Sequence, residues 1–333
     1  MTDSAKIILP GGNGFLGHVL AEWFTALGHQ VVVLSRGQHK YRGPGRAVAW
    51  DGRTLGQWRH ELEGATAIVN LAGRSVNCRY HASNRAAMMN SRIEPTRILG
   101  EAIAACYSPP AAWLNSSTAT IYQHSLDRPM DELTGTIAAT PEAKDAFSIE
   151  VATAWEREFF AASTPRTRKV ALRTAMVFGD YPGTVYRVLR RLARLGLGGP
   201  MAGGEQYVSW MHQRDFCRAI EFLIDRDDIS GPVNLAAPRP LTNRAMMHVI
   251  RHALGVPFGL PAARWMLEVG AFFLRTETEL IIKSRRVVPG RLLSSGFCFD
   301  YENLASAVAQ LETAGHTSVD NMHNSRVAVS TTR

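Results

Sequence analysis

The chain has 333 residues, of which 46% are hydrophobic and 20% are charged. This length suits one large α/β domain with a smaller second region, and the balance excludes disordered and fibrous proteins. The net charge of +8 makes polyanions conceivable partners. The densest basic run, 187–194, has apolar residues at helical spacing and no nucleic-acid-binding motif beside it. We therefore expect a basic surface that binds anionic small molecules, without a specific nucleic-acid partner.

The cysteines and the apolar segments predict a cytoplasmic protein. Four cysteines lie far apart and fit neither a metal site nor a disulfide framework; they are Cys78, Cys106, Cys217 and Cys298. No export signal is recognisable at the N-terminus. The apolar stretch 257–274 is interrupted by Arg264 and Glu268, so it predicts a buried helix rather than a membrane span. We expect no metal and no membrane partner, and the sequence is compatible with a homodimer.

Apolar runs alternate with helical patterns through the first half of the chain. The runs are 7–9, 30–34, 48–50, 67–71, 113–116 and 170–173. Between the first two, residues 15–27 have a helical apolar face, and Gly28 suits the position after a helix end. This alternation is typical of a Rossmann fold, a doubly wound parallel α/β sheet.

The pattern changes at about Gly179, where helices joined by glycine-rich turns begin, and the chain reads as mostly helical after Thr242. We predict an NADP-binding Rossmann domain in 1–178, joined by parts of 205–240. A smaller, mostly helical substrate region takes 179–204 and 241–311, and the polar segment 312–333 is expected to hang free as a disordered tail.

The first run leads into a glycine-rich loop, GGNGFLG at 11–17, which opens the first helix. In such a loop Gly11 allows the tight turn, Gly14 lets the backbone approach a pyrophosphate, and Gly17 lets helix and strand pack closely. The helix N-terminus then offers free N–H groups to the phosphates. The alternative is a glycine turn without a ligand, but the preceding strand and following helix favour a dinucleotide site.

The end of the second run distinguishes NAD from NADP. An acidic residue there would bind the ribose 2′-hydroxyl, whereas an arginine accommodates a 2′-phosphate. Here the run ends in Ser35 and Arg36, with Lys40 and Arg42 close behind and no acidic residue before Asp51. NADP(H) is therefore the predicted cofactor, unless Arg36 only solvates a strand end.

Further motifs follow in a specific order along residues 6–311. They include Trp50-Asp51, Asn70-Leu71-Ala72-Gly73, Ser91-Arg92, Thr96-Arg97, Trp155-Glu156, Leu172-Arg173-Thr174, 197–200, 209–212, Asn234-Leu235, 238–243, 287–289 and Gly296-Phe297. With the glycine loop and Ser35-Arg36, this set resembles the atypical extended short-chain dehydrogenases/reductases called the epimerase family, which are related to nucleotide-sugar epimerases and carry their own C-terminal domain.

The resemblance implies further contacts to the cofactor. Leu71 and Ala72 would line the adenosine side, Arg92 would reach toward the cofactor, and Val177 would lie beside the nicotinamide. Without the resemblance, Leu71 and Ala72 are simply a strand end, and Arg92 is a solvated helix residue. The predicted cofactor-binding residues are Gly11, Asn13, Gly14, Phe15, Leu16, Gly17, Ser35, Arg36, Leu71, Ala72, Gly73, Arg92 and Val177.

The resemblance also implies a catalytic hydroxyl, for which Thr118, or Ser117 in its place, holds the matching position. A strand-end cap is the alternative reading. The tyrosine that exchanges a proton, and the lysine four residues later, are absent, because Ser148 and Ala152 occupy their positions. Serine and alanine supply neither a phenol nor an ammonium group.

Another proton donor is therefore needed if the chain is catalytic. Tyr122 follows Thr118 by four residues, and His212 titrates near neutrality, so both are candidates. His212 could equally be a loop histidine bonded to backbone. Asp215 is expected to cap a helix that begins at about Phe216.

Two functions remain open from the sequence. The first is an NADP(H)-dependent oxidoreductase or epimerase-like enzyme that transfers hydride to or from a small hydroxyl or carbonyl compound. The second is a non-catalytic NADP(H)-binding redox sensor, which the missing tyrosine and lysine favour.

Overall fold

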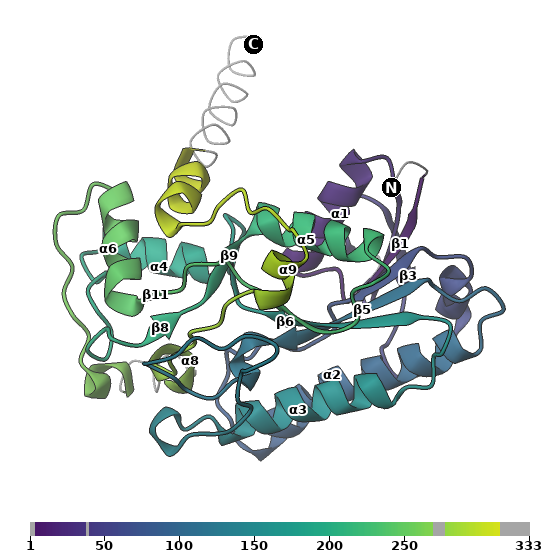
Figure 1. Cartoon of the computed structure of the whole chain (residues 1–333), viewed down its shortest axis with the longest axis horizontal. Helices are drawn as coiled ribbons and strands as arrows, with labels where there is room; N and C mark the ends of the chain where they lie inside the picture. Colours follow the sequence, from purple (N-terminus) through teal and green to yellow (C-terminus); the bar gives the residue numbers. More distant parts are fainter. Residues whose placement is uncertain (1–3, 38–39, 269–276, 314–333) are drawn as a thin grey trace, which may run out of the picture.

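The computed structural model describes residues 4–37, 40–268 and 277–313. Its centre is a seven-stranded parallel sheet with the strand order β10-β6-β5-β4-β1-β2-β3 (Figure 1). The strands are β1 (Lys6–Pro10), β2 (Gln30–Ser35), β3 (Arg46–Ala49), β4 (Ala67–Asn70), β5 (Ala112–Thr118), β6 (Arg168–Thr174) and β10 (Gly231–Leu235). The predicted Rossmann fold is confirmed. All six predicted strands are present, and β10 adds a seventh at the edge beside β6.

The central strands bury both of their faces, because successive side chains point to opposite sides of the sheet. On β1, Ile7 and Leu9 pack with α1 (Phe15–Ala26) and α5 (Gln213–Asp225), whereas Ile8 packs on the other face. There it meets α2 (Ala82–Ala104) and α3 (Ala146–Ala161), which lie together below the sheet in Figure 1. Helices on both faces explain why these strands are apolar throughout.

The first βαβ unit follows the predicted pattern closely. Helix α1 ends at Ala26, and Gly28 follows with a φ of +83°, a backbone conformation that glycine adopts at no steric cost. The chain then enters β2, whose residues pair in register with β1 from Lys6 opposite Gln30 to Pro10 opposite Leu34.

A second core lies beyond the carboxyl ends of β5 and β6. Its elements are β7 (Met176–Phe178), α4 (Val185–Arg194), β8 (Tyr207–Val208), β9 (Trp210–His212), β11 (Leu241–Thr242), α6 (Asn243–Ala253) and α8 (Glu279–Ile282). Helix α9 (Gly290–Ser294) packs instead on β10, where Leu292 joins the core on the α1 side of the sheet. Phe178, Tyr186 and Trp210 are fully buried within this core. Strand β9 leads directly into α5, so the core is joined to the sheet.

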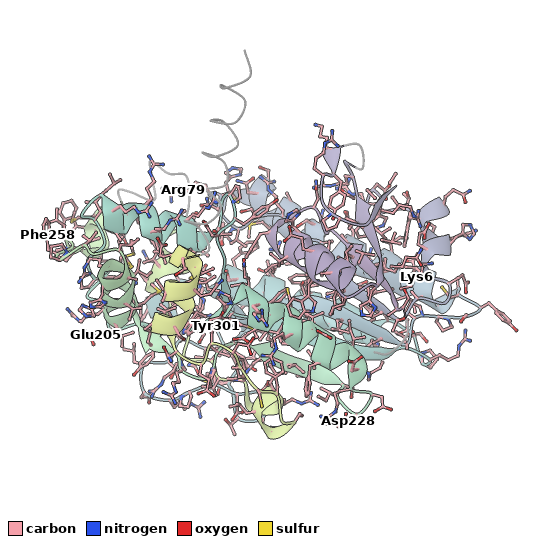
Figure 2. All side chains as sticks on the ribbon, turned by 90° about the horizontal axis from the view of Figure 1, so that it is seen from above. Lys6, Arg79, Glu205, Asp228, Phe258 and Tyr301 are labelled. Carbon is pink, nitrogen blue, oxygen red and sulfur yellow. The ribbon has the colours of Figure 1, made fainter. Side chains whose placement is uncertain are left out.

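The predicted burial of the stretch 257–274 is wrong for the part that the structure describes. Phe258 is 65% exposed, Trp265 is 67% exposed and Met266 is also exposed. Figure 2 shows Phe258 at the end of the molecule opposite Lys6. Apolar content alone did not distinguish this surface from core. Phe272, Phe273 and the predicted tail from residue 314 onward lie outside the described residues.

The start of α5 also differs from the prediction. The helix begins at Gln213, three residues earlier than expected, and His212 is its N-cap residue. Asp215 lies in the first turn and accepts hydrogen bonds from the backbone N–H groups of Asp300 and Tyr301. The carboxylate therefore attaches the late segment to α5 rather than capping the helix.

Candidate functional site

The glycine loop between β1 and α1 has two positions that only glycine fits. Gly11 has a φ of +74°, and a Cβ atom there would lie 2.6 Å from the Cα atom of Ala72. A Cβ atom on Gly17 would lie 2.3 Å from the Cα atom of Gly12. These contacts bring the loop, the helix and the end of β4 together, which is the packing expected of a dinucleotide-binding turn.

Gly14 differs from the other two because a Cβ atom there would meet nothing within 4 Å. It is the N-cap residue of α1, where no side chain caps the free N–H groups. Asn13 and Gly14 are exposed, and Phe15 and Leu16 are partly buried in the first turn. An open helix N-terminus of this kind attracts phosphate through its N–H groups and its partial positive charge.

Arg36 stands at the carboxyl end of β2, beside this loop. Its side chain is exposed and makes no hydrogen bond or ion pair with the residues that the structure describes. Ser35 is buried, and its Oγ accepts a hydrogen bond from Gly37 N at 3.3 Å. Arg36 is therefore available to an anion at the strand end.

A hydrogen-bonded turn shapes the segment after β4. Asn70 is fully buried, donates to Asn115 Oδ1 at 2.7 Å and accepts from Ala72 N at 3.0 Å. Leu71 N donates to Pro10 O, which holds this turn against the glycine loop. Leu71 and Ala72 thus lie beside Gly11, as a shared cofactor edge requires.

Arg92 supports the same segment from α2. Its guanidinium donates to the backbone oxygens of Met88 and Arg74 and lies over the Trp155 ring, 5.2 Å from the ring centroid. It is also next to Gly73, where a Cβ atom would lie 3.6 Å from the Arg92 Cζ atom. Its reach toward the cofactor stays a prediction, while its hydrogen bonds position the segment after β4.

Val177 and Thr118 lie in different sheets, Val177 in the two-stranded sheet of β7 and β9 and Thr118 at the end of β5 in the main sheet. Val177 is the central residue of β7, is partly buried and pairs with Met211. Thr118 ends β5, and its Oγ1 accepts a hydrogen bond from Thr120 N at 3.1 Å. The hydroxyl thus caps a short 3-10 helix, yet its own proton has no acceptor among the described residues. Its catalytic role stays a prediction.

Tyr122 belongs to a buried network rather than to an open site. Its hydroxyl donates to Asn234 Oδ1 at 2.9 Å and accepts from Arg173 Nη1 at 2.8 Å. Arg173 also forms a two-pronged ion pair with Glu156, at 2.8 Å from each carboxylate oxygen, and Ser117 Oγ donates to Glu156. Burial raises the pKa of Tyr122, and these contacts do not favour it or Ser117 as proton donors.

His212 is far from a free imidazole. It is 1% exposed, its Nδ1 accepts from Arg214 N, and its Nε2 lies 3.0 Å from Gln310 Oε1. Burial lowers its pKa from 6.5 to about 4. The neutral ring acts as a helix cap, which does not favour the predicted role as an acid.

We expect His212 to make the protein sensitive to acid. Because its folded-state pKa is depressed, the unfolded chain binds the proton first, and stability falls as the pH drops from 6.5 toward 4. At about 1.4 kcal/mol per pKa unit, this loss is about 3 kcal/mol. His212→Asn keeps an N-cap acceptor and removes the titration, so urea unfolding across this range should show a shallower decline.

The exposed His60 provides the control, because His60→Asn should keep the native decline. Identical declines in His212→Asn and the native protein would contradict this effect.

The structure brings together a set of polar residues that sequence spacing did not reveal. Tyr80 follows β4, Ser148 lies in the first turn of α3, and Glu279 begins α8. The Ser148 hydroxyl lies near the other two side chains, and its proximity acts to lower both of their pKa values. Burial outweighs this effect, raising the pKa of Tyr80 to about 12 and raising that of Glu279.

A buried ion pair adjoins this set. Lys283 Nζ lies 2.6 Å from Asp145 Oδ2 and donates to Thr120 O at 2.6 Å, and both charged side chains are fully buried. The contact at Asp145 Oδ2 is an ion pair without hydrogen-bond geometry. Burial lowers the pKa of Lys283. The pair joins the start of α3 to the segment after α8.

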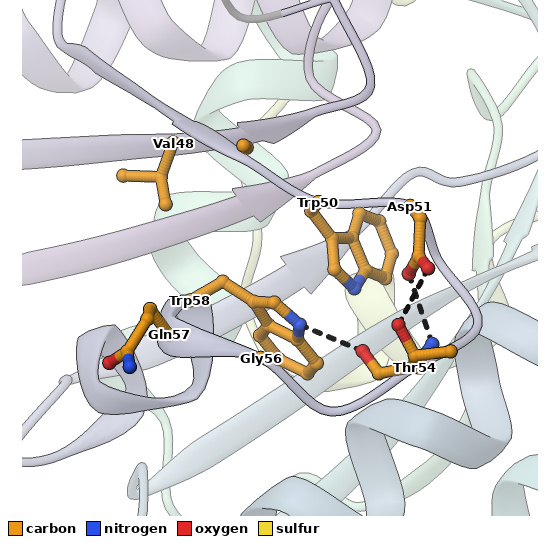
Figure 3. A pocket seen from close by; sticks show the side chains of 8 residues that line it. Val48, Trp50, Asp51, Thr54, Gly56, Gln57 and Trp58 are labelled. Carbon is orange, nitrogen blue, oxygen red and sulfur yellow. Dashed lines mark hydrogen bonds between the residues drawn. The ribbon is translucent and has the colours of Figure 1, made fainter.

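One cavity lies beside Tyr80 and Glu279, and another lies apart from them at the end of β3. One of about 270 Å³ is lined by Tyr80, Arg85, Lys144, Ala146, Phe147, Glu277, Thr278 and Glu279. The other, of about 430 Å³, lies at the end of β3 beside Trp50 and Trp58 (Figure 3). There Asp51 accepts from Thr54 N and Thr54 Oγ1, and Trp50 Nε1 is buried without a hydrogen-bond partner.

Residues 4–37, 40–268 and 277–313 contain neither a candidate metal site nor a candidate membrane span. No group of three or more His, Cys, Asp or Glu side chains there could hold a metal ion. Over the same residues, no helix combines the length and the apolar character that a membrane span requires. All four cysteines are free thiols.

Known proteins resemble the chain over nearly its whole length. It is 31% identical to the epimerase family protein SDR39U1 of Bos taurus, covering 92% of this chain and 99% of that protein. It is 28% identical to the epimerase family protein YfhF of Bacillus subtilis, covering 92% and 97%. The crystal structure of human SDR39U1 with NADPH superposes with a TM-score of 0.79 at 28% identity, covering 92% and 98%.

A more distant neighbour shares the fold alone. UDP-N-acetylglucosamine 4-epimerase from Bacillus cereus matches with a TM-score of 0.70 at 20% identity, covering 93% and 96%.

Family models match two successive parts of the chain. The model of a domain of unknown function, DUF1731, matches residues 262–311, which include α8 and α9. The model described as the NAD dependent epimerase/dehydratase family matches residues 7–236, which include the whole parallel sheet. The chain therefore belongs to the NAD dependent epimerase/dehydratase family, within the extended short-chain dehydrogenases/reductases.

Proposed function

We propose that the chain binds NADP(H) across the carboxyl ends of β1, β2 and β4 and transfers hydride to or from a small hydroxyl or carbonyl compound. The observation that carries the proposal is the loop of Gly11, Gly14 and Gly17, which is closed by backbone contacts but open toward solvent at Gly14. The relative crystallised with NADPH supports the choice of cofactor.

Arg36 gives the preference for a 2′-phosphate. A phosphorylated ribose at the end of β2 would meet an exposed guanidinium that has no carboxylate partner among the described residues. The adenine then extends toward the end of β3, where Trp50 and Asp51 border the larger cavity. The nicotinamide end would cross to the ends of β5 and β7, near Thr118 and Val177.

Replacing Arg36 with alanine tests this arrangement. A charge-assisted contact contributes about 2 kcal/mol, so Arg36→Ala should weaken NADPH binding roughly 30-fold and leave NADH binding unchanged. Quenching of tryptophan fluorescence measures both affinities. Arg157→Ala, on the exposed face of α3, is the matched control and should change neither. Equal losses for NADPH and NADH would contradict a role in recognising the 2′-phosphate.

The catalytic half of the proposal needs a separate experiment. NADPH-loaded protein is mixed with a panel of aldehydes and ketones, and loss of NADPH fluorescence reports hydride transfer. Nucleotide sugars are incubated with the NADP⁺-loaded protein, and NMR spectra report an epimer. Turnover in either assay supports an oxidoreductase or epimerase-like enzyme.

The second candidate is a non-catalytic NADP(H)-binding redox sensor. The residues Ser148 and Ala152 favour it, because neither supplies the phenol or the ammonium group of the usual acid/base pair. Tight NADPH binding without turnover in either assay would support this function.

The free cysteines fit a cytoplasmic location. Association into a homodimer stays a prediction, which analytical ultracentrifugation decides.

A further inference from the structure

The cavity of about 270 Å³ lies at the edge of the sheet where this fold binds its ligands. Tyr80 comes from the segment that leaves the carboxyl end of β4, and Ala146 and Phe147 come from the start of α3, which follows β5. Strands β4 and β5 are neighbours. In parallel α/β sheets, ligands bind outside the carboxyl ends of the strands. The second core supplies the remaining wall through Glu277, Thr278 and Glu279.

Two polar atoms in this wall are buried without a partner. The Ser148 hydroxyl lies near both side chains, but the Tyr80 hydroxyl oxygen and Glu279 Oε1 have no hydrogen bond of normal geometry among the described residues. Glu279 is 3% exposed. A buried polar atom without a partner costs about 1–3 kcal/mol, so two at one cavity call for an explanation. A ligand oxygen in the cavity would satisfy both.

The shape and charge of the cavity indicate the ligand class. The rings of Tyr80 and Phe147 meet edge to face with centroids 5.2 Å apart, and they form an apolar wall. The described lining carries two cations, Arg85 and Lys144, and two acidic residues, Glu277 and Glu279. This balance suits a small uncharged molecule better than a diphosphate. The volume of about 270 Å³ has room for a planar carbonyl compound.

We propose that this cavity binds the carbonyl group of the substrate and that Glu279, with Tyr80 beside it, supplies the proton in place of the missing tyrosine and lysine. The role rests on the proposed hydride transfer. NADPH gives a hydride to the carbonyl carbon and becomes NADP⁺, and the C=O π electrons move to oxygen. The Glu279 carboxyl group protonates that oxygen, and solvent reprotonates the carboxylate.

The surroundings of Glu279 support this role. Burial raises its pKa, so the acid form that the reaction needs persists to a higher pH than in a glutamate exposed to water. The basic groups Lys283 and Arg285 act in the opposite direction, and Asp145 reinforces the rise. The Tyr80 hydroxyl, with its pKa raised to about 12, remains a hydrogen-bond donor and holds the carbonyl oxygen.

Deuterium transfer from (4-²H)NADPH to benzaldehyde and to cyclohexanone, detected by mass spectrometry, tests the proposal. Native protein should deuterate at least one probe. Glu279→Gln, which keeps the side-chain shape, should reduce the rate at least 100-fold, and Tyr80→Phe about 10-fold. Both should bind NADPH as the native protein does. Glu142→Gln, at an exposed neighbouring position, should keep the native rate.

Rescue separates a chemical role from a structural one. Glu279→Ala should be inactive, and added formate, a small carboxylic acid, should restore part of its rate by entering the cavity. Native activity should fall as the pH rises through the Glu279 pKa, and Glu279→Gln should lack this dependence.

The contrary outcomes distinguish the two proposals. If Glu279→Gln transfers deuterium at the native rate, the role of Glu279 is overturned, but the hydride-transfer function is not. NADPH binding without deuterium transfer to either probe by the native protein would overturn both the hydride-transfer function and this role.

Discussion

Replacing Gly17 with alanine should destabilise the protein by about 3 kcal/mol, the upper range for inserting an atom into packed structure. The added Cβ would lie 2.3 Å from the Cα atom and 2.4 Å from the oxygen of Gly12. Both are backbone atoms of the turn, which cannot rotate aside as a side chain can. Elsewhere in a helix, alanine is more favourable than glycine by about 1 kcal/mol, so the sign is diagnostic. Urea unfolding measures the effect.

Gly14→Ala is the matched control for stability. Its Cβ would meet nothing within 4 Å, so the free energy of unfolding should fall by no more than about 1 kcal/mol, the usual cost of alanine at an N-cap position. An unchanged stability in Gly17→Ala would contradict the close approach of α1 to the loop.

Replacing Glu156 with alanine should destabilise the protein by about 3–5 kcal/mol, because Arg173 would be left as a buried charge without its partner. The two side chains are only 11% and 7% exposed. Glu156 also accepts a hydrogen bond from Ser117, and Arg173 donates to Tyr122. Loss of the carboxylate therefore disturbs α3, β5 and β6 together. Chemical denaturation with a two-state fit gives the difference.

Glu158 lies on the same helix and pairs with Arg97 at the surface, with 27% and 54% of the side chains exposed. Exposed ion pairs contribute about 0–1 kcal/mol, so Glu158→Ala is the control for charge removal. A loss for Glu156→Ala no greater than that for Glu158→Ala would show that the buried network adds nothing to stability.

The sheet could be predicted because its information is local. Each strand is a short apolar run, and the glycine loop lies between a strand and a helix with an apolar face. The motif pairs Trp155-Glu156 and Leu172-Arg173 also resembled the family, and the structure explains them, since Glu156 and Arg173 meet in the core. Sequence alone did not show that this pair also binds Tyr122, which was therefore predicted as catalytic.

The remaining site depends on contacts between distant segments. Tyr80, Ser148 and Glu279 have no common spacing, and only the packing of the second core on the sheet brings them together. Burial likewise decided the state of His212, whose isolated chemistry suggests an acid near neutrality. A residue such as Trp265 was predicted as core from its apolar character, although its neighbours leave it exposed.

Calorimetric titration of the native protein with NADPH and NADH, repeated on Gly14→Ala, tests the central claim most directly. The native protein should bind NADPH at least ten-fold tighter than NADH, a difference of about 1.4 kcal/mol or more. Gly14→Ala should stay folded but bind neither nucleotide, because its Cβ fills the space of the pyrophosphate. Native affinity in Gly14→Ala, or no binding of either nucleotide by the native protein, would contradict the assignment of the glycine loop as the cofactor site.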